Sequence, residues 1–259
     1  MQSHRSASMR NAETSLDAEG GSGPKLVCFA PEQREVEARI APERLLKQGF
    51  HELLGGGPGD ECASLGIALS MSWEACASTG KSLCVCMLES EAQERGRLYG
   101  SGLAALGIAA ERAITVTAAR EKDLLWALEE ALTSGAFGAV VGMLGIDERL
   151  YTFPQSRRLK LRSAAAATPF FLLRHWQSGG ATAATGRWRV TALPSRSAGK
   201  HGDFRLPGPS RLQLRLERMA SLPPQSWEIE FDATRHLHLV PLLEHGPTGK
   251  AIRRRRSAA

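Results

Sequence analysis

The chain has 259 residues, of which 42% are hydrophobic, so it is long enough for one large folded domain with flexible ends. No stretch approaches the roughly 18 apolar residues of a membrane span, and the first twenty residues mix acidic and basic side chains without an apolar run. We therefore expect a cytoplasmic protein with neither a membrane span nor a secretion signal. Its odd number of cysteines predicts buried free thiols rather than a disulfide framework: Cys28, Cys62, Cys76, Cys84 and Cys86.

The charge is unevenly divided along the chain. Residues 1–149 carry 14 Lys and Arg against 21 Asp and Glu, whereas residues 150–259 carry 19 against 6. A basic half of this kind is suited to bind a polyanion or an acidic protein surface, and it is equally compatible with a solvated basic face that has no partner.

Composition divides the chain into three regions. Residues 1–24 are polar and predict a disordered segment, residues 25–245 predict one folded domain, and residues 246–259 predict a basic, disordered tail. Within the domain, apolar residues at helical spacing in 32–48 predict a helix that is interrupted at Pro42.

From Phe50 onwards, apolar strands alternate with helical segments. We expect strands at 50–54, 83–88, 113–117, 139–144 and 169–174, and helices at 61–77, 92–106, 121–133 and 154–167. This alternation predicts an α/β fold with a mainly parallel sheet flanked by helices. Further along, short strands predict antiparallel pairing that extends one edge of the sheet, at 187–190, 212–216, 227–231 and 236–240.

Two segments compete for the role of a phosphate-binding loop. The first, A-C-A-S-T-G-K-S at 75–82, matches the P-loop consensus except that alanine replaces the first glycine. A helix is expected before it and a strand after it, which is the reverse of the order that points helix amides at a phosphate. Lys81 is therefore expected to be an exposed turn residue.

The second segment follows the strand at 50–54 and leads into a helix, which is the required order. Here acidic residues replace the second glycine and the phosphate-binding lysine of the consensus, and a cysteine replaces the magnesium-binding hydroxyl. This degenerate phosphate loop consists of Gly55, Gly56, Gly57, Gly59, Asp60, Glu61 and Cys62. Because a carboxylate repels phosphate, we expect no nucleotide cofactor, no metal and no catalysis; acids in a first helical turn also simply favour the helix dipole.

The magnesium-binding element of a nucleotide site is incomplete as well. The apolar run 139–141 ends in Gly142, where an acid would be required. Glu89 ends the strand at 83–88, where a water-activating glutamate could sit, but we interpret it as the start of a helix.

Three basic clusters are candidates for binding DNA or a partner. Arg187 and Arg189 flank Trp188, so that the arginines could contact phosphate while the ring stacks on a base; alternatively, Trp188 packs in the sheet and its neighbours point to solvent. The expected helix at 154–167 carries a second cluster: Arg157, Arg158, Lys160 and Arg162. An electrostatic tether is predicted by Arg253, Arg254, Arg255 and Arg256.

The order of the segments resembles the RecA recombinase core. The resemblance lies in H-E-L-L-G-G-G-P-G-D-E, then T-G-K-S-L-C-V-C-M-L-E and R-L-Y-G-S-G-L-A-A-L-G-I. Together with A-R-E-K-D-L-L-W-A-L-E-E-A-L and A-V-V-G-M-L-G-I, the chain resembles the ImuA family, RecA-like accessory proteins of bacterial translesion synthesis, over about residues 48–192.

The resemblance implies a RecA-like protein without polymerase activity that is induced in the SOS response to DNA damage. It implies two partners in the nucleoid-associated cytoplasm, an inactive Y-family-like polymerase of the ImuB type and an error-prone C-family polymerase, with RecA or single-stranded DNA as further candidates. Two alternatives stay open. One is an ATPase with an atypical site completed by a Lys or Arg from a neighbouring subunit, and the other is a cell-division inhibitor of the degenerate RecA-like type.

Overall fold

The computed structural model describes residues 26–28, 42–195, 197–201, 204–231 and 237–240. The strands are β1 (Leu26–Cys28), β2 (Phe50–Gly55), β3 (Ser82–Leu88), β4 (Ala113–Ala118), β5 (Phe137–Met143), β6 (Phe170–Arg174), β7 (Gly186–Leu193), β8 (Ser197–His201), β9 (Phe204–Pro207), β10 (Arg211–Met219), β11 (Gln225–Phe231) and β12 (Leu237–Val240). The helices are α1 (Pro42–Leu46), α2 (Glu61–Thr79), α3 (Glu89–Arg95), α4 (Gly100–Ala105), the 3₁₀ turn η1 (Ala110–Arg112), α5 (Glu121–Thr133) and α6 (Phe153–Ala166). The segments at 1–24 and 246–259, with Arg253 to Arg256, lie outside the described residues.

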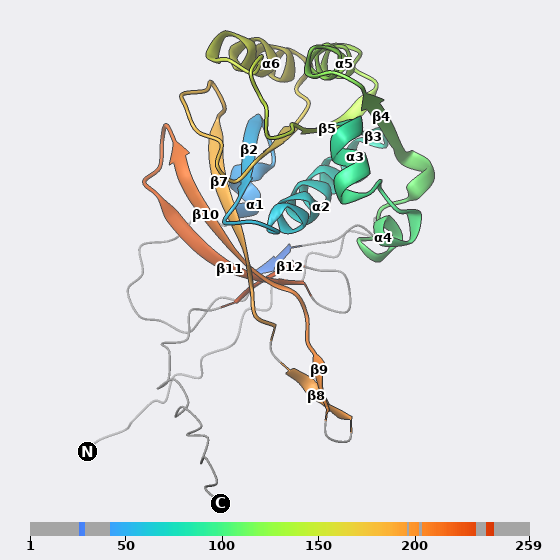
Figure 1. Cartoon of the computed structure of the whole chain (residues 1–259), viewed down its shortest axis with the longest axis vertical. Helices are drawn as coiled ribbons and strands as arrows, with labels where there is room; N and C mark the ends of the chain where they lie inside the picture. The colour runs from blue at the N-terminus through green and yellow to red at the C-terminus, as the bar shows by residue number, and fades with distance from the viewer. Residues whose placement is uncertain (1–25, 29–41, 196, 202–203, 232–236, 241–259) are drawn as a thin grey trace, which may run out of the picture.

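Ten strands form one mixed sheet in the order β1-β12-β11-β10-β7-β2-β6-β5-β3-β4 (Figure 1). Every neighbouring pair from β7 to β4 is parallel, whereas β10, β11 and β12 continue the sheet by antiparallel pairing beyond β7. The α/β class and the mainly parallel core with antiparallel C-terminal strands are therefore confirmed.

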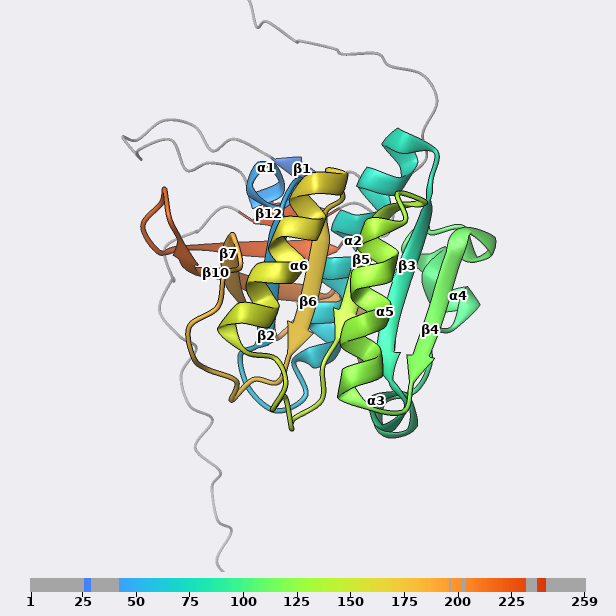
Figure 2. The same cartoon turned by 90° about the horizontal axis from the view of Figure 1, so that it is seen from above.

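Helices cover both faces of the parallel half. Side chains of α2 pack with Leu53, Val85 and Val141 in one core cluster, and side chains of α5 and α6 pack with Phe50 and Phe170 in the other. Figure 2 shows α5 and α6 side by side over their face of the sheet. The buried strands are nearly continuous apolar runs because both of their faces are covered.

The structure differs from the expected elements in several places. The helix expected at 92–106 is two helices, because Gly96 (φ +88°) ends α3 and an extended segment precedes α4. Strand β7 is parallel to β2 and is antiparallel only to β10. The strand expected at 139–144 is confirmed as β5, and Gly142 lies inside it rather than at the end of its apolar run. The hairpin β8–β9 was not expected, and it extends away from the main sheet in Figure 1. Of the segment 32–48, the structure describes a helix only from Pro42 to Leu46.

The described cysteines include one exception to the expected burial. Cys76, Cys84 and Cys86 are buried free thiols, whereas Cys62 is exposed. Cys84 and Cys86 lie on one face of β3 with their sulfur atoms 3.7 Å apart. None of the described helices is long and apolar enough to cross a membrane.

A buried imidazole joins β2 to β7. His51 is fully buried; its Nε2–H donates to the Gln48 carbonyl (2.9 Å), and its Nδ1 accepts a hydrogen bond from Trp188 Nε1 (3.2 Å). Burial lowers the pKa of His51 to about 4, so the ring is neutral at pH 7.

This burial predicts a loss of stability in mild acid. An unfolded histidine has a pKa of about 6.5, so between pH 6.5 and 4 the unfolded state binds more protons than the folded state, and stability falls as the pH falls. The pKa difference corresponds to about 3 kcal/mol over this window. Urea unfolding between pH 7 and 4.5 checks this.

The matched variant is His51→Gln, which is less stable at neutral pH but has no imidazole to titrate. Burial raises the pKa of Glu91, which has the opposite effect on stability, but Glu91 is present in both proteins. The difference between the two pH profiles therefore isolates His51, and parallel profiles would contradict the assignment.

Candidate functional site

The degenerate phosphate loop connects β2 to α2 at the carboxyl end of the parallel strands, the edge where open α/β sheets bind their ligands. Gly59 has φ +89°, a conformation that favours glycine. The order strand, glycine loop, helix is thus as expected.

The loop is closed against β7 rather than open toward a ligand. The Gly56 N–H donates to the Val190 carbonyl (2.7 Å). A Cβ at Gly56 would lie only 1.9 Å from Thr191 Oγ1, so only glycine fits there without a shift of Thr191. This bond continues the parallel β2–β7 ladder by one residue into the loop.

Asp60 fixes the other end of the loop to the same strand. Its Oδ1 accepts a hydrogen bond from the Ala192 N–H (3.0 Å). In addition, Arg189 Nη1 donates to the Gly55 carbonyl (2.8 Å), so β7 holds the loop through backbone and side-chain contacts. A charged acceptor makes the Asp60 contact stronger than a neutral hydrogen bond.

Glu61, at the position of the phosphate-binding lysine, acts as an internal anion. Its Oε2 accepts the Gly59 N–H (3.0 Å) and lies 3.2 Å from Arg95 Nη1. Arg95 Nε in turn lies 2.6 Å from Glu91. Burial alone would lower the pKa of Arg95, but the Glu91 and Glu61 carboxylates more than offset this and raise it, so the guanidinium stays charged.

The remaining nucleotide-site positions carry no oxygen ligand for magnesium. Cys62 places an exposed thiol where a magnesium-binding hydroxyl would be required. Gly142 lies inside β5, where an added Cβ would approach Leu172 (2.8 Å) and Leu128 (3.0 Å), so it is a packing residue rather than the end of the strand. The described residues contain no group of three His, Cys, Asp or Glu side chains that could hold a metal ion.

Two interpretations of the neighbouring residues are confirmed. Glu89 is the first residue of α3 and is exposed, as a helix-start residue should be. Lys81 lies between the left-handed Gly80 that ends α2 and the start of β3, and its exposed ammonium donates to the Gly135 carbonyl (2.7 Å). It lies at the amino end of the strands, away from the degenerate phosphate loop.

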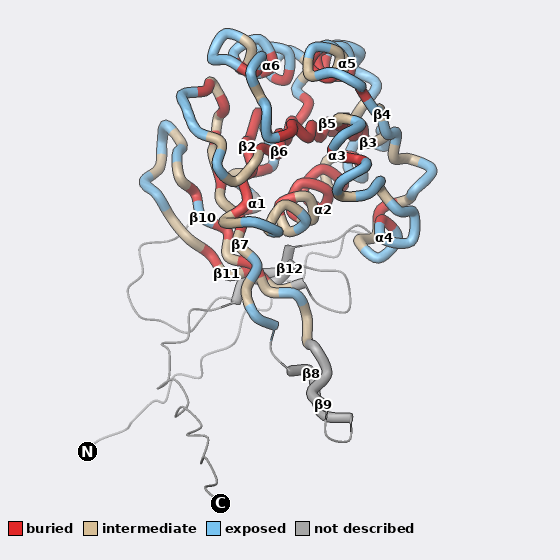
Figure 3. The backbone as a smooth tube through the Cα atoms, viewed as in Figure 1, coloured by how far each residue is buried: buried red, intermediate tan, exposed pale blue. Residues whose placement is uncertain are grey.

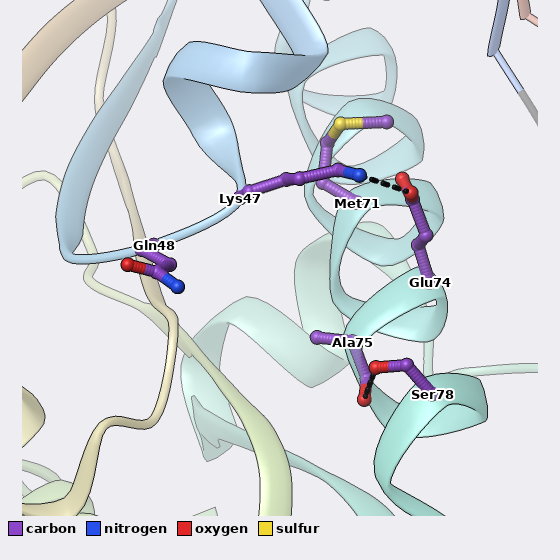
Figure 4. A pocket seen from close by; sticks show the side chains of 6 residues that line it. All are labelled: Lys47, Gln48, Met71, Glu74, Ala75 and Ser78. Atoms are coloured by element: carbon purple, nitrogen blue, oxygen red, sulfur yellow. Dashed lines mark hydrogen bonds and ion pairs between the residues drawn. The ribbon is translucent and has the colours of Figure 1, made fainter.

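One hollow in the described part of the molecule lies away from the loop. It is a shallow depression of about 200 Å³ between α1 and the second half of α2, and the Lys47–Glu74 ion pair (3.2 Å) crosses it (Figure 4). Its lining consists of Lys47, Gln48, Met71, Glu74, Ala75 and Ser78.

A network of buried charged residues lies around Glu52 of β2, and sequence reasoning missed it. Glu52 of β2 is fully buried; it accepts hydrogen bonds from Tyr151 Oη (2.6 Å) and Arg187 Nε (2.9 Å) and lies 3.3 Å from Arg174 Nη1. Arg174 Nε also donates to Glu148 (2.8 Å). A polar His51–Glu52 pair within an apolar strand was the signal that could have revealed it.

The expected DNA-binding cluster on β7 is engaged inside the protein. Trp188 is fully buried against Trp227, with ring centroids 5.8 Å apart. Arg187 is paired with Glu52, and Arg189 lies 2.5 Å from Glu217. The buried ring of Trp188 has no face exposed for stacking on a base.

Comparison with known proteins adds no family assignment. No protein-family profile matches the chain, and no curated protein sequence matches it. The site is therefore interpreted from its own geometry.

The closure of the loop predicts that Gly56 is structurally required. Gly56→Ala should destabilise the protein by about 1–3 kcal/mol, because the new methyl group overlaps Thr191. Combining it with Thr191→Ala should recover part of that loss, because the nearest overlapping atom is removed. Urea unfolding of the single and double variants measures both effects.

Lys81→Ala is the control, because an exposed substitution of this kind changes stability by at most about 0.5 kcal/mol. Equal stability of Gly56→Ala and the wild type would show that the loop does not close against β7.

Proposed function

We propose that the protein is a non-catalytic, RecA-like adaptor in SOS-induced error-prone translesion synthesis. It acts with an inactive Y-family-like polymerase and an error-prone C-family polymerase, and these partners come from the resemblance to the ImuA family.

The observation that supports the non-catalytic part is that groups of the protein itself bind amides and a carboxylate of the degenerate phosphate loop. The Gly56 and Gly59 amides bond to Val190 and Glu61, and the Asp60 carboxylate bonds to the Ala192 amide. A triphosphate would have to displace these contacts and approach two carboxylates. Each lost contact and each like-charge approach opposes binding.

The RecA-like part is supported by how the recognised segments meet in space. The loop after β2, Glu89 after β3 and the end of β5 all lie at the carboxyl edge of one mainly parallel sheet. Helices cover both faces of these strands. The segments that carry the resemblance to the RecA core are separate in the sequence and lie together at one edge of the sheet.

We expect the purified protein neither to hydrolyse ATP nor to bind it in a magnesium-dependent way. Calorimetric titration with Mg-ATP and a phosphate-release assay test this, with Glu61→Ala measured in parallel. Micromolar, magnesium-dependent binding, or turnover that disappears in Glu61→Ala, would overturn the non-catalytic proposal.

The adaptor function predicts a specific set of partners in cells with damaged DNA. A tagged chain should co-purify with the two polymerase-type proteins after damage, and Glu61→Ala should retain them because no nucleotide is needed. Recovery of cell-division proteins in place of polymerases would favour the division-inhibitor alternative.

A further inference from the structure

The strand at one end of the main sheet has an unpaired outer edge. β4 is the last strand in the sheet order, and it pairs in parallel with β3 alone. Among the described residues, no backbone hydrogen bond joins 114–118 to any element other than β3. Every second residue of such a strand directs its N–H and C=O away from the sheet, so β4 presents a row of free donors and acceptors.

β4 also lacks the features that usually protect a sheet edge. Natural edge strands carry charged residues, prolines or bulges, or a further segment covers them. The six residues of β4, A-I-T-V-T-A, include no charge and no proline, and their register with β3 has no shift. Ile114 is 47% exposed, and Thr115 and Thr117 are exposed as well (Figure 3). The edge is therefore accessible to another strand.

The side chains of β4 are divided between the two faces of the sheet. Val116 packs against the core on the α5 side, and Ala113 packs against the core on the opposite side. Because side chains alternate along a strand, Ile114 shares the face of Val116. Thr115 and Thr117 share the face of Ala113.

This arrangement is complementary to a second β4 in antiparallel orientation. A two-fold axis through Thr115 places the two copies of Thr115 opposite each other. It also places Ile114 opposite Val116 of the second copy, and Ala113 opposite Thr117 of the second copy. Pairs of threonines and pairs of β-branched apolar residues are suited to neighbouring antiparallel strands. The half-exposed Ile114 thus gains an apolar neighbour on its own face.

The charges around β4 permit two copies to meet. Residues 111–123 hold three acidic and three basic residues, which cancel: Glu111, Glu121 and Asp123, with Arg112, Arg120 and Lys122. Antiparallel pairing brings the beginning of one strand to the end of the other, so the exposed Glu111 of each copy comes toward the exposed Arg120 of the second copy. Arg120 bonds to Asp123 through Nε and Nη2, so its Nη1 can face a second carboxylate.

We propose that β4 pairs with β4 of a second copy of this chain, antiparallel and centred on Thr115, so that a two-fold dimer forms one continuous sheet. The inference goes beyond the proposed function, because it depends on the edge of the sheet and not on the phosphate loop or on polymerase partners. The ATP and co-purification experiments can therefore fail without affecting it.

Sedimentation velocity of the full chain tests the dimer. A single strand pair forms a small interface, so we expect a reversible monomer–dimer equilibrium between about 1 and 500 µM. Thr115→Lys places two like charges opposite each other at the axis and should raise the dimer Kd about tenfold or more. Thr152→Lys is the matched control, because Thr152 is an exposed threonine that precedes α6, and α6 lies away from β4 in Figure 2. It should leave the Kd unchanged.

A charge-swap experiment separates pairing of two copies from any other effect of a substitution at Thr115. Thr115→Glu should also weaken the dimer, because two carboxylates then face each other. An equimolar mixture of Thr115→Lys and Thr115→Glu should dimerise at least about tenfold more tightly than either variant alone, because opposite charges meet at the axis. Recovery in the mixture also shows that both variants are folded.

Three results would overturn the proposal. The first is a chain that remains monomeric at every concentration. The second is a dimer that Thr115→Lys leaves intact, which would place the contact elsewhere. The third is a mixture that does not recover dimerisation although both variants have the circular dichroism of the wild type, which would show that the two copies of Thr115 do not face each other.

Discussion

The attachment of the glycine loop to β7 is the contact on which the interpretation of the site depends. Gly56 and Asp60 bond to consecutive parts of β7, through the Val190 carbonyl and the Ala192 amide. In a working phosphate loop the amides at the start of the helix and the helix dipole face an anionic ligand. Here the protein supplies its own anions, Asp60 and Glu61, so the loop serves as a joint that fixes β2 and α2 to the strand where the parallel and antiparallel halves meet.

Buried charged residues on the other face of the sheet also connect β2 to its neighbouring strands. Glu52 connects β2 to β6 and β7 through Arg174 and Arg187, and Tyr151 brings the segment after β5 to the same carboxylate. A buried ion pair contributes little net stability because desolvation opposes the attraction, but removing one partner leaves an uncompensated charge and costs several kcal/mol. The network therefore fixes the arrangement of these strands, and it pairs Arg187 with a carboxylate inside the protein.

Sequence periodicity predicted the elements wherever one rule dominated. The helix at 121–133 is α5 within its stated bounds, and the context argument placed Lys81 correctly between α2 and β3. The pairing of β7 was predicted wrongly, and the partners of Arg187 and Arg189 were not predicted at all, because long-range contacts decide both. The parallel pairing of β7 with β2 and the partners of Arg187 and Arg189 involve residues more than a hundred positions apart, or on a strand expected only to extend an edge. No local pattern carries that information, and a tryptophan between two arginines is the same string whether it is buried or free.

Amide hydrogen exchange resolved by NMR tests the central claim most directly. If the loop is closed by the protein's own groups, the amides of Gly56 and Ala192 should be protected in the nucleotide-free protein, and millimolar Mg-ATP should leave their exchange rates unchanged. Asp60→Asn, which removes the charge of the acceptor, should speed exchange at Ala192 more than at Gly56. Rapid exchange at both amides that Mg-ATP slows would mean that the loop is open and binds nucleotide, which would contradict the account.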